Sequence, residues 1–349
     1  MPAEFRGYRA GDERQLVELF GRVFGRAISE AHWLWKFKGL PSPAENVWLG
    51  VVNEEVVFQY ACIPTPFRLP DGERLAMVSA DVMTAVPFRR MGLLTEGARR
   101  AYRGYQAAGA SFVIGLPNQA WGTRTEALGW ERLFPLCWLT LPLRPERLLA
   151  ARLAWPWLGS LTWVGALWNR LLARRSRSPD PALAVRPITA ASEAFDELWH
   201  ESLADSYLSV VRNRDWIDWR YFSCPSFDYQ VLLAERAGRP VGYAVYRWER
   251  DAGRHLGVIA ELVAPRTDAG AWHALLESIL GMGQHAHADS LVTLAVPGSP
   301  AYAALRRFGY IPRRRSFDVM MVDLDPALPL AAMRDPSRWL MAGGDFDVV

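Results

Sequence analysis

Apolar residues recur with two different periods in the first part of the chain, and these periods predict a helix and a hairpin. Between residues 11 and 26 the apolar positions fall three and four apart, as on one face of a helix. These positions are Leu16, Leu19, Phe20, Val23 and Phe24. Residues 47–69 contain two apolar runs on either side of a polar turn at residues 53–55, which predicts a β-hairpin.

Strands and helices alternate in the pattern as far as residue 143. The mainly apolar run at 73–86 predicts a long strand. Residues 93–109 have helical periodicity and end at a glycine, which predicts an amphipathic helix. Strands are expected at 111–117 and 130–143, with a short helix between them.

Two segments of the first half recur in the second half. The sequence WKFKGLP at 35–41 matches WRYFSCP at 219–225, and residues 113–130 match residues 293–310. The two offsets are 184 and 180 residues, so the order and the separation of the segments are both kept. We infer a duplicated domain.

The predicted fold class is α/β (α+β), with two tandem domains that each contain a mixed, mostly antiparallel sheet flanked by helices. We place the first domain at residues 1–145 and the second at residues 182–326. A hydrophobic and then basic segment at 146–181 joins them, and a tail follows at 327–349.

Composition narrows the class of protein. Half of the residues are hydrophobic and 22% are charged, so the chain can bury substantial cores, and a net charge of +3 does not indicate a nucleic-acid partner. Cys62, Cys137 and Cys224 have the scattered positions of buried thiols in a reducing compartment. The first residues are polar and form no signal sequence, so we expect a cytoplasmic protein. The histidines, including the nearby pair His285 and His287, predict no metal site.

The joining segment has an unusual composition. Residues 153–168 are uncharged and rich in tryptophan, and Arg174, Arg175 and Arg177 follow them. One interpretation is an interdomain segment packed on one of the domains. The other is a weak membrane-surface contact through residues 153–177, with tryptophan at headgroup depth and arginine against anionic lipid.

Two arginines and a glycine precede the helix predicted at 93–109. The first amides of a helix have no partner in the helix and carry positive partial charge. Arg89, Arg90 and Gly92 would allow a phosphate to approach these amides closely. The alternative interpretation is a solvated loop that is basic by chance.

This stretch resembles the pyrophosphate loop of the GNAT acetyltransferase family, Arg/Gln-x-x-Gly-x-Gly/Ala between the fourth strand and the helix that follows. RRMGLL at 89–94 matches it, except that Leu94 stands where Gly or Ala is usual. The family's Asn after the fifth strand, with Gly and an aromatic residue eleven and twelve positions later, is matched by Asn118, Gly129 and Trp130. The resemblance covers about residues 76–140.

The resemblance implies that the first domain binds acyl-CoA, with acetyl-CoA as donor and no metal. The backbone amides of residues 90–95 would hold the pyrophosphate, and the backbone of residues 84–86 would pair with the pantetheine arm. The residues implied in binding are Thr84, Val86, Arg89, Arg90, Met91, Gly92, Leu93, Leu94, Thr95 and Asn118.

Transfer of an acyl group to an amine needs a base and a donor to the oxyanion. Asp81 is the candidate base, with a purely structural carboxylate as the alternative, and the backbone N–H near Val86 is the candidate oxyanion donor. The family often has a tyrosine acid where this chain has Thr125. Tyr60, Tyr102 or solvent could replace it, although both tyrosines also fit a packing role, as does Trp121.

The second half lacks the loop. Its APRTDAGAWHALL places Asp268 where an anion would bind, and Gly298 stands in the place of Asn118. We therefore expect one active site. Asp345 and Asp347 near the end predict either a disordered or packed terminus, or an acidic patch that selects a cationic acceptor.

The leading hypothesis is a bacterial, acetyl-CoA-dependent N-acyltransferase acting on a small amine, for which family analogy suggests an amino sugar of a polysaccharide. A second hypothesis is an aminoacyl-tRNA-dependent transferase that builds peptidoglycan bridges, although such an enzyme has no need of the pyrophosphate loop. A third is an inactive acyl-CoA-binding scaffold or sensor.

Overall fold

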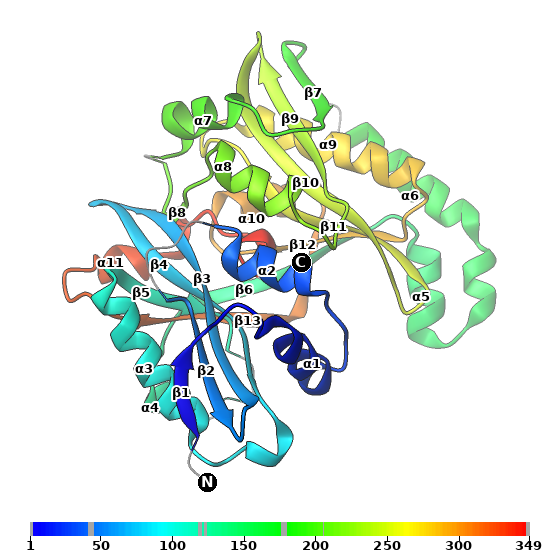
Figure 1. Ribbon diagram of the computed structural model, residues 1–349. Helices are drawn as coiled ribbons and strands as arrows, with labels where there is room; N and C mark the ends of the chain where they lie inside the picture. The colour runs from blue at the N-terminus through cyan, green and yellow to red at the C-terminus, as the bar shows by residue number, and fades with distance from the viewer. Residues whose placement is uncertain are drawn as a thin grey trace. The chain divides into compact units, whose positions relative to one another are not determined.

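The structure is a computed structural model that describes residues 3–40, 45–117, 121, 124–175, 180–204 and 206–346 (Figure 1). Its internal contacts divide the chain into two compact units. Unit 1 contains residues 1–134, 223–226 and 317–334. Unit 2 contains residues 135–222, 227–316 and 335–349.

Unit 1 is a sheet in the order β1-β2-β3-β4-β5-β13, in which only the β4–β5 pair is parallel. Its strands are β1 (Glu4–Gly7), β2 (Val47–Val52), β3 (Glu55–Leu69), β4 (Gly72–Thr84), β5 (Ala110–Gly115) and the end of β13 (Ile311–Asp323). Its helices are α1 (Glu13–Phe24), α2 (Glu30–Lys38), α3 (Leu93–Ala107), α4 (Arg124–Ala127) and α11 (Leu330–Met333).

The helices of unit 1 cover both faces of its sheet. Phe58 and Gln59 are neighbours on β3, so their side chains point to opposite faces. Phe58 packs under α3, where a Cβ on Gly97 would lie 2.2 Å from its ring, so only glycine allows this approach. Gln59 accepts a hydrogen bond from Trp33 Nε1 of α2 (3.1 Å). Helices α3 and α2 therefore lie on opposite faces.

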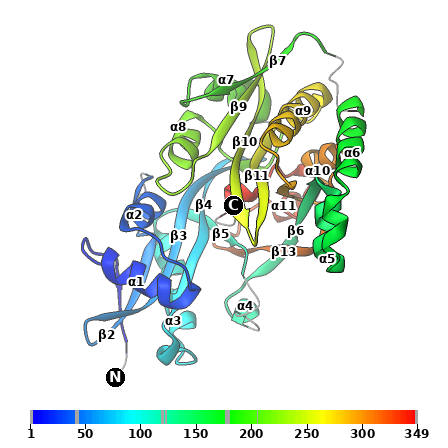
Figure 2. The same cartoon turned by 90° about the vertical axis from the view of Figure 1, so that its right-hand side faces the viewer.

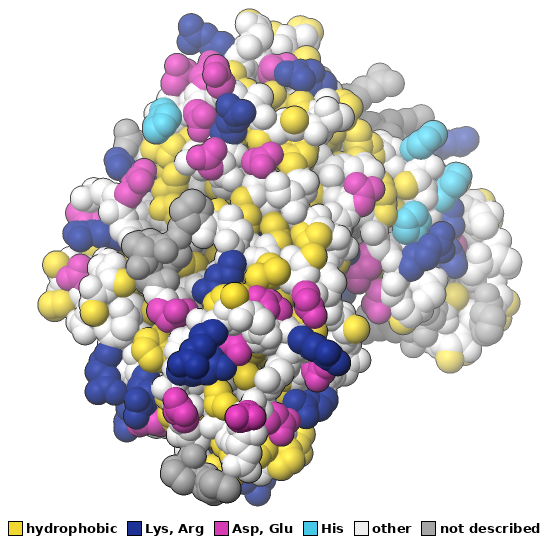
Figure 3. Space-filling view, viewed as in Figure 1, with side chains coloured by type: hydrophobic (Ala, Val, Ile, Leu, Met, Phe, Trp, Pro, Cys, Tyr) yellow, Lys and Arg dark blue, Asp and Glu magenta, His cyan; other side chains and the backbone are white. Residues whose placement is uncertain are grey.

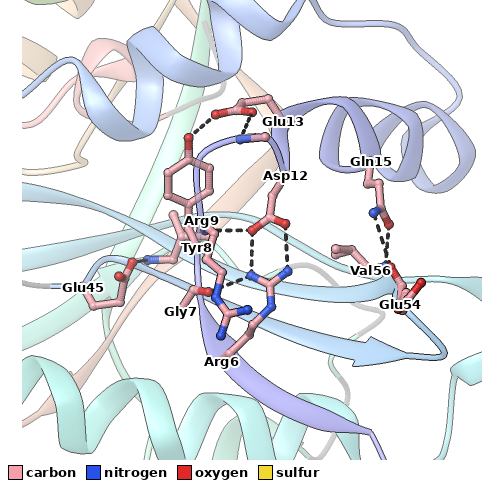
Figure 4. Close-up of polar contacts among 12 residues, drawn as sticks. Arg6, Gly7, Tyr8, Arg9, Asp12, Glu13, Gln15, Glu45, Glu54 and Val56 are labelled. Carbon is pink, nitrogen blue, oxygen red and sulfur yellow. Dashed lines mark hydrogen bonds and ion pairs between the residues drawn. The ribbon is translucent and has the colours of Figure 1, made fainter.

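Polar contacts tie α1 to the edge of the same sheet (Figure 4). Arg6 on β1 forms a bidentate pair with Asp12 at the start of α1 (2.7 and 2.8 Å), and this hydrogen-bonded guanidinium lowers the pKa of Asp12. Gln15 accepts from the backbone N–H of Val56 at the start of β3 (2.8 Å). These bonds hold the amphipathic helix expected at 11–26 against β3.

Unit 2 has a sheet in the order β7-β9-β10-β11-β12-β6, in which only β11 and β12 are parallel. Its strands are the end of β6 (Glu131–Pro142), β7 (Leu183–Ile188), β9 (Gln230–Arg236), β10 (Arg239–Asp251), β11 (Arg254–Val263) and β12 (Ser290–Ala295), with a short β8 (Ser209–Val210). Its helices are α5 (Pro145–Leu153), α6 (Thr162–Arg175), α7 (Ala194–Leu198), α8 (Arg214–Ile217), α9 (Ala269–His285) and α10 (Pro300–Phe308). The predicted fold class, mixed and mostly antiparallel sheets flanked by helices, is confirmed.

The sixth strand of each sheet comes from the other half of the sequence. In unit 1, residues 320–323 of β13 pair with residues 112–115 of β5. In unit 2, residues 137–142 of β6 pair with residues 290–295 of β12. The compact units therefore differ from the continuous ranges 1–145 and 182–326, because β6 and β13 each begin in one unit and end in the other.

None of the three cysteines forms a disulfide, and they are not equally buried. Cys62 is fully buried on β3, and burial raises the pKa of its thiol to about 12. Cys137 and Cys224 are partly exposed, so the expectation of three buried thiols was wrong for these two. Cys224 follows the helical turn that ends at Phe222 and lies in no strand or helix, which leaves its side chain less covered.

Candidate functional site

The end of β4 leaves its neighbour β5 and distorts against β3. The ladder between β4 and β5 ends at Val78 and Ile114 among the described residues, although β4 continues to Thr84. On the other side the register with β3 shifts between Gln59 and Ala61. Asp81 lies opposite this shift with φ 47°, a left-handed conformation that is rare for aspartate within a strand. This bulge is where the sequence placed the candidate base.

The loop after β4 presents a bare helix N-terminus. A turn of 3₁₀ helix spans Val86–Phe88, and α3 begins at Leu93, as the sequence predicts. Gly92 has φ 82° and Arg90 has φ 67°, so both adopt the left-handed conformation. No side chain caps α3, and a helix leaves its first amides without partners inside the helix. The chain therefore offers several N–H donors at one exposed turn, which suits an anion.

The two loop arginines are exposed beside these amides. Arg89 Nε donates to the carbonyl oxygen of Thr84 (3.2 Å), the residue that ends β4. That oxygen points away from β3, because the next amide, of Ala85, donates toward Val57 on β3 (2.8 Å). Arg89 therefore folds back along the part of β4 that β5 does not cover, where the family resemblance led us to expect the pantetheine arm.

Asp81 has a partner that the sequence analysis missed. Lys36 Nζ of α2 lies 2.6 Å from Asp81 Oδ2, and the two side chains are only 2% and 7% exposed. Gln59 Nε2 donates to the backbone oxygen of Asp81 (2.9 Å) and so supports the bulge. One signal was available, because Lys36 is the cation of the repeated segment at 35–41 and one of only two lysines. A lysine ammonium this close to a carboxyl group favours its charged form, which is the form that a base requires.

Tyr60 and Tyr102 form a buried aromatic cluster away from solvent. Their hydroxyls lie 3.0 Å apart, and Trp130 Nε1 donates to the Tyr102 hydroxyl (2.9 Å). Burial raises the pKa of both tyrosines well above the ordinary value of 10.0. The Trp121 ring packs edge-on against Tyr60 and against Trp130. These contacts fit the packing role better than that of an acid in the reaction.

The sequence-predicted site residues lie together where β4 ends and α3 begins. They are Asp81, Thr84, Val86, Arg89, Arg90, Met91, Gly92, Leu93, Leu94 and Thr95. Asn118 lies outside the described residues. Thr125 lies on α4, and its backbone oxygen accepts from the amide of Trp130 (2.9 Å).

The corresponding helix start in unit 2 is capped. Asp268 Oδ1 accepts from the backbone N–H of Ala271 in the first turn of α9 (2.9 Å). Arg236 forms a bidentate pair with the same carboxylate, and this hydrogen bonding lowers the pKa of Asp268. A carboxylate of the chain already occupies the place that an anion would take, as the sequence led us to expect.

The unit 2 counterpart of Asp81, by the 180-residue offset, is Glu261 on β11, and it is fully buried. Arg212 lies against both Glu261 (3.4 Å) and Asp345 (2.6 Å), and the side chains of all three are at most 1% exposed. Gly344 packs so closely over this cluster that a Cβ would lie 2.0 Å from the Tyr221 hydroxyl. The acidic surface patch proposed for the terminus was therefore wrong for Asp345, and Asp347 lies outside the described residues.

Three further observations concern other kinds of site. Within the described ranges, no group of three or more His, Cys, Asp or Glu could hold a metal ion. In the same part of the chain, no helix is long and apolar enough to cross a membrane. On the face shown in Figure 3, basic and acidic side chains are interspersed and form no large area of one sign.

Comparison with known proteins gives a match to one family model and several similar folds. Residues 4–133 match the family model described as acetyltransferase (GNAT) domain. The fold resembles the GCN5-related N-acetyltransferase from Anabaena variabilis ATCC 29413, at 12% identity and a TM-score of 0.67 over 93% of this chain and 73% of that one. No curated protein matches the sequence.

Two further solved structures share the fold. A protein of Enterococcus faecalis V583 described as a probable N-acyltransferase has 14% identity and a TM-score of 0.67, over 93% of this chain and 73% of that one. Eis1 from Mycobacterium abscessus has 14% identity and a TM-score of 0.58, over 93% and 74%. At such identities the likeness shows the fold alone.

Proposed function

We propose that this protein transfers an acyl group, acetyl in the first place, from acyl-CoA to a small amine, because residues 4–133 match the family model described as acetyltransferase (GNAT) domain. One observation carries the proposal. The uncapped start of α3, with left-handed Gly92 and two exposed arginines, directly follows the end of β4 that β5 does not cover. Such a turn suits the diphosphate of CoA.

The residues present fit this group. The amides of residues 90–95, together with Arg89 and Arg90, would hold the diphosphate. The backbone of Thr84 to Val86 would pair with the pantetheine arm, which would share the Thr84 oxygen with Arg89 or displace it. Bound acyl-CoA would supply a thioester. The amine nitrogen would form a bond to its carbonyl carbon, the C–S bond would break, and the CoA thiolate would leave and take a proton from solvent.

Residues of the chain would remove the proton of the amine and stabilise the negative charge that develops on the carbonyl oxygen. Asp81, held as a carboxylate by Lys36, would take the proton of the acceptor amine. Because Asp81 is almost fully buried, we favour transfer through a water molecule. The backbone N–H of Val86 follows the last ladder bond of β4 and would stabilise negative charge on the carbonyl oxygen.

We propose a single active site, in unit 1. The capped start of α9 and the buried Glu261 support the view that unit 2 binds no acyl-CoA. The shared strand order of the two units supports a tandem duplication. The three cysteines, none of which forms a disulfide, support a cytoplasmic location. An amino sugar as acceptor rests on family analogy.

A second candidate is an acyl-CoA-binding sensor without turnover. Thr125 in place of a tyrosine acid, together with the burial of Tyr60 and Tyr102, favours it. The loop at residues 89–94 argues against transfer from aminoacyl-tRNA, because that donor has no diphosphate for the loop to bind.

Release of free CoA tests the proposed reaction. The full chain is mixed with acetyl-CoA and a panel of small amines that includes amino sugars, and free thiol is measured with a colorimetric reagent. We expect CoA release that depends on one class of amine and is lost with Asp81→Asn. Binding of acetyl-CoA without release for any amine would overturn the transferase in favour of the sensor.

A further inference from the structure

A helical hairpin in unit 2 carries an exposed apolar surface. It consists of α5, the 3₁₀ turn Pro156–Ser160 and α6, drawn in green in Figures 1 and 2. Its exposed large apolar side chains, the hairpin patch, are Leu149, Leu153, Trp155, Trp157, Trp163, Leu167 and Leu171. They are between 44% and 65% exposed, and only five other large apolar side chains of the described chain are similarly exposed.

One side of α6 anchors it to unit 2. Trp168 Nε1 donates to the backbone oxygen of Pro142 (2.7 Å), and Asn169 Nδ2 donates to that of Leu143 (2.7 Å). Leu172 is buried on the same side. These contacts attach α6 to the end of β6, so this side of the hairpin is packed on the rest of unit 2.

The other side of α6 is apolar where a surface helix is normally polar. Trp163, Leu167 and Leu171 follow one another at intervals of four residues and form a continuous exposed stripe. Exposed apolar areas of this kind mark sites that bind another surface.

Tryptophan is unusually frequent in the patch. The rings of Trp155 and Trp157 lie 6.1 Å apart and nearly parallel, and Trp163 is the most exposed side chain of the patch. An indole combines a large apolar body with an N–H donor, and it is enriched where hydrocarbon meets lipid headgroups. Protein interfaces are also enriched in tryptophan, so tryptophan alone does not distinguish a lipid surface from a protein partner. The charge of the residues around the patch distinguishes the two.

The charge around the patch is positive. Residues 144–175 contain six arginines and one acidic residue, Glu146, and one of the arginines, Arg147, is paired with the buried Asp289 (2.8 Å). Glu146 is buried under Gly165, where it adds no acidic side chain to the surface. Arg170 is exposed beside Leu171 at the end of the stripe. The side chains of Arg152, Arg174 and Arg175, and all of Arg177, lie outside the described part of the chain.

We propose that the hairpin patch docks the protein on an anionic lipid bilayer, with Trp155, Trp157 and Trp163 at headgroup depth. Basic residues beside apolar and aromatic ones are the composition of an interfacial membrane contact. A helix of 14 residues is about 21 Å long, shorter than the hydrocarbon core, so α6 would lie along the surface. This inference does not depend on the proposed reaction.

Vesicle flotation with the full chain tests the proposal. One set of vesicles is phosphatidylcholine alone, and the other contains phosphatidylglycerol as well. We expect the protein to float with the anionic vesicles, and the triple variant Trp155→Ser, Trp157→Ser, Trp163→Ser to bind them about 100-fold more weakly. The matched control Ile311→Ser removes an equally exposed apolar side chain of unit 2 outside the patch and should bind as the parent does.

Two further measurements test the contribution of Arg170 and the depth of the tryptophans in the bilayer. Arg170→Gln should weaken binding to anionic vesicles about fivefold, because one arginine near such a surface contributes about 1 kcal/mol. Brominated acyl chains should quench tryptophan fluorescence in the parent and much less in the triple variant, whose native fold circular dichroism checks.

Two results would overturn the proposal. One is equal flotation of the parent and the triple variant. The other is a parent protein that binds neither kind of vesicle and is a dimer by light scattering, while the triple variant is a monomer. That result would mean that the patch binds a second copy of this chain.

Discussion

Replacing Lys36 with methionine is expected to lower the free energy of unfolding by about 3–5 kcal/mol. Lys36 and Asp81 form an ion pair at 2.6 Å with almost no exposure to solvent. Removing one member leaves the other charge buried without its partner, which costs more than the pair itself contributes. Urea denaturation followed by circular dichroism measures the loss.

The double variant Lys36→Met, Asp81→Asn is the control for this loss, and it also separates the two interpretations of Asp81. It removes both charges of the Lys36–Asp81 pair, so most of the lost stability should return. If Asp81 takes the proton, the stable double variant should bind acetyl-CoA normally and release CoA about 100 to 10,000 times more slowly. Full activity in the double variant would make Asp81 a structural carboxylate. A loss below about 1 kcal/mol in Lys36→Met would contradict the buried pair.

Replacing Arg212 with methionine should destabilise the protein by a similar amount, about 3–5 kcal/mol at pH 8. Arg212 is the cation that lies against Glu261 and Asp345, and its Nη2 bonds both oxygens of Asp345 (2.6 and 2.8 Å). Without Arg212 two buried carboxylates would face each other. Thermal and urea unfolding of the variant against the parent give the difference.

The pH dependence of this loss has a definite sign. Burial raises the pKa of Asp345 from 3.8 to about 6, with Arg212 opposing the rise and Glu261 adding to it. The folded state therefore binds a proton between pH 4 and 6 that the unfolded state has released, which favours folding and is lost as the pH rises through 6.

Removing Arg212 takes away the charge that lowers the pKa of Asp345, so this pKa rises further and the destabilisation should be smaller at pH 5 than at pH 8. Arg307→Met, at an exposed arginine of α10, is the matched control and should change stability little at either pH. An Arg212→Met loss that grows as the pH falls would contradict the buried cluster.

Local features of the site could be predicted from the sequence. The glycine at 92, the arginine pair and the apolar periodicity of residues 93–109 are all encoded within a few residues, and α3 begins at Leu93 as expected. Backbone propensity and amphipathic pattern act over this range. The bulge at Asp81 was not predicted, because nothing in an apolar strand marks where its register shifts.

Contacts between distant residues were the part that the sequence could not supply. Lys36 precedes its partner by 45 residues, and Asp345 follows Arg212 by 133, so no local pattern connects either pair. A polar Gly-Gly-Asp segment has the composition of a surface tail, yet it is buried over Glu261. The strand patterns of β6 and β13 were clear, but a pattern does not tell which strand will be the neighbour.

Calorimetric titration of acetyl-CoA into the full chain tests whether the loop before α3 holds the CoA diphosphate. We expect one binding site per chain. Arg89→Ala combined with Arg90→Ala should weaken binding at least about 100-fold, since hydrogen bonds to charged groups contribute about 1.5–3 kcal/mol each. Arg103→Ala, an exposed arginine farther along α3, should leave the affinity unchanged. Absence of binding by the parent, or equal binding by the loop variant and the Arg103 control, would rule out this loop as the acyl-CoA site.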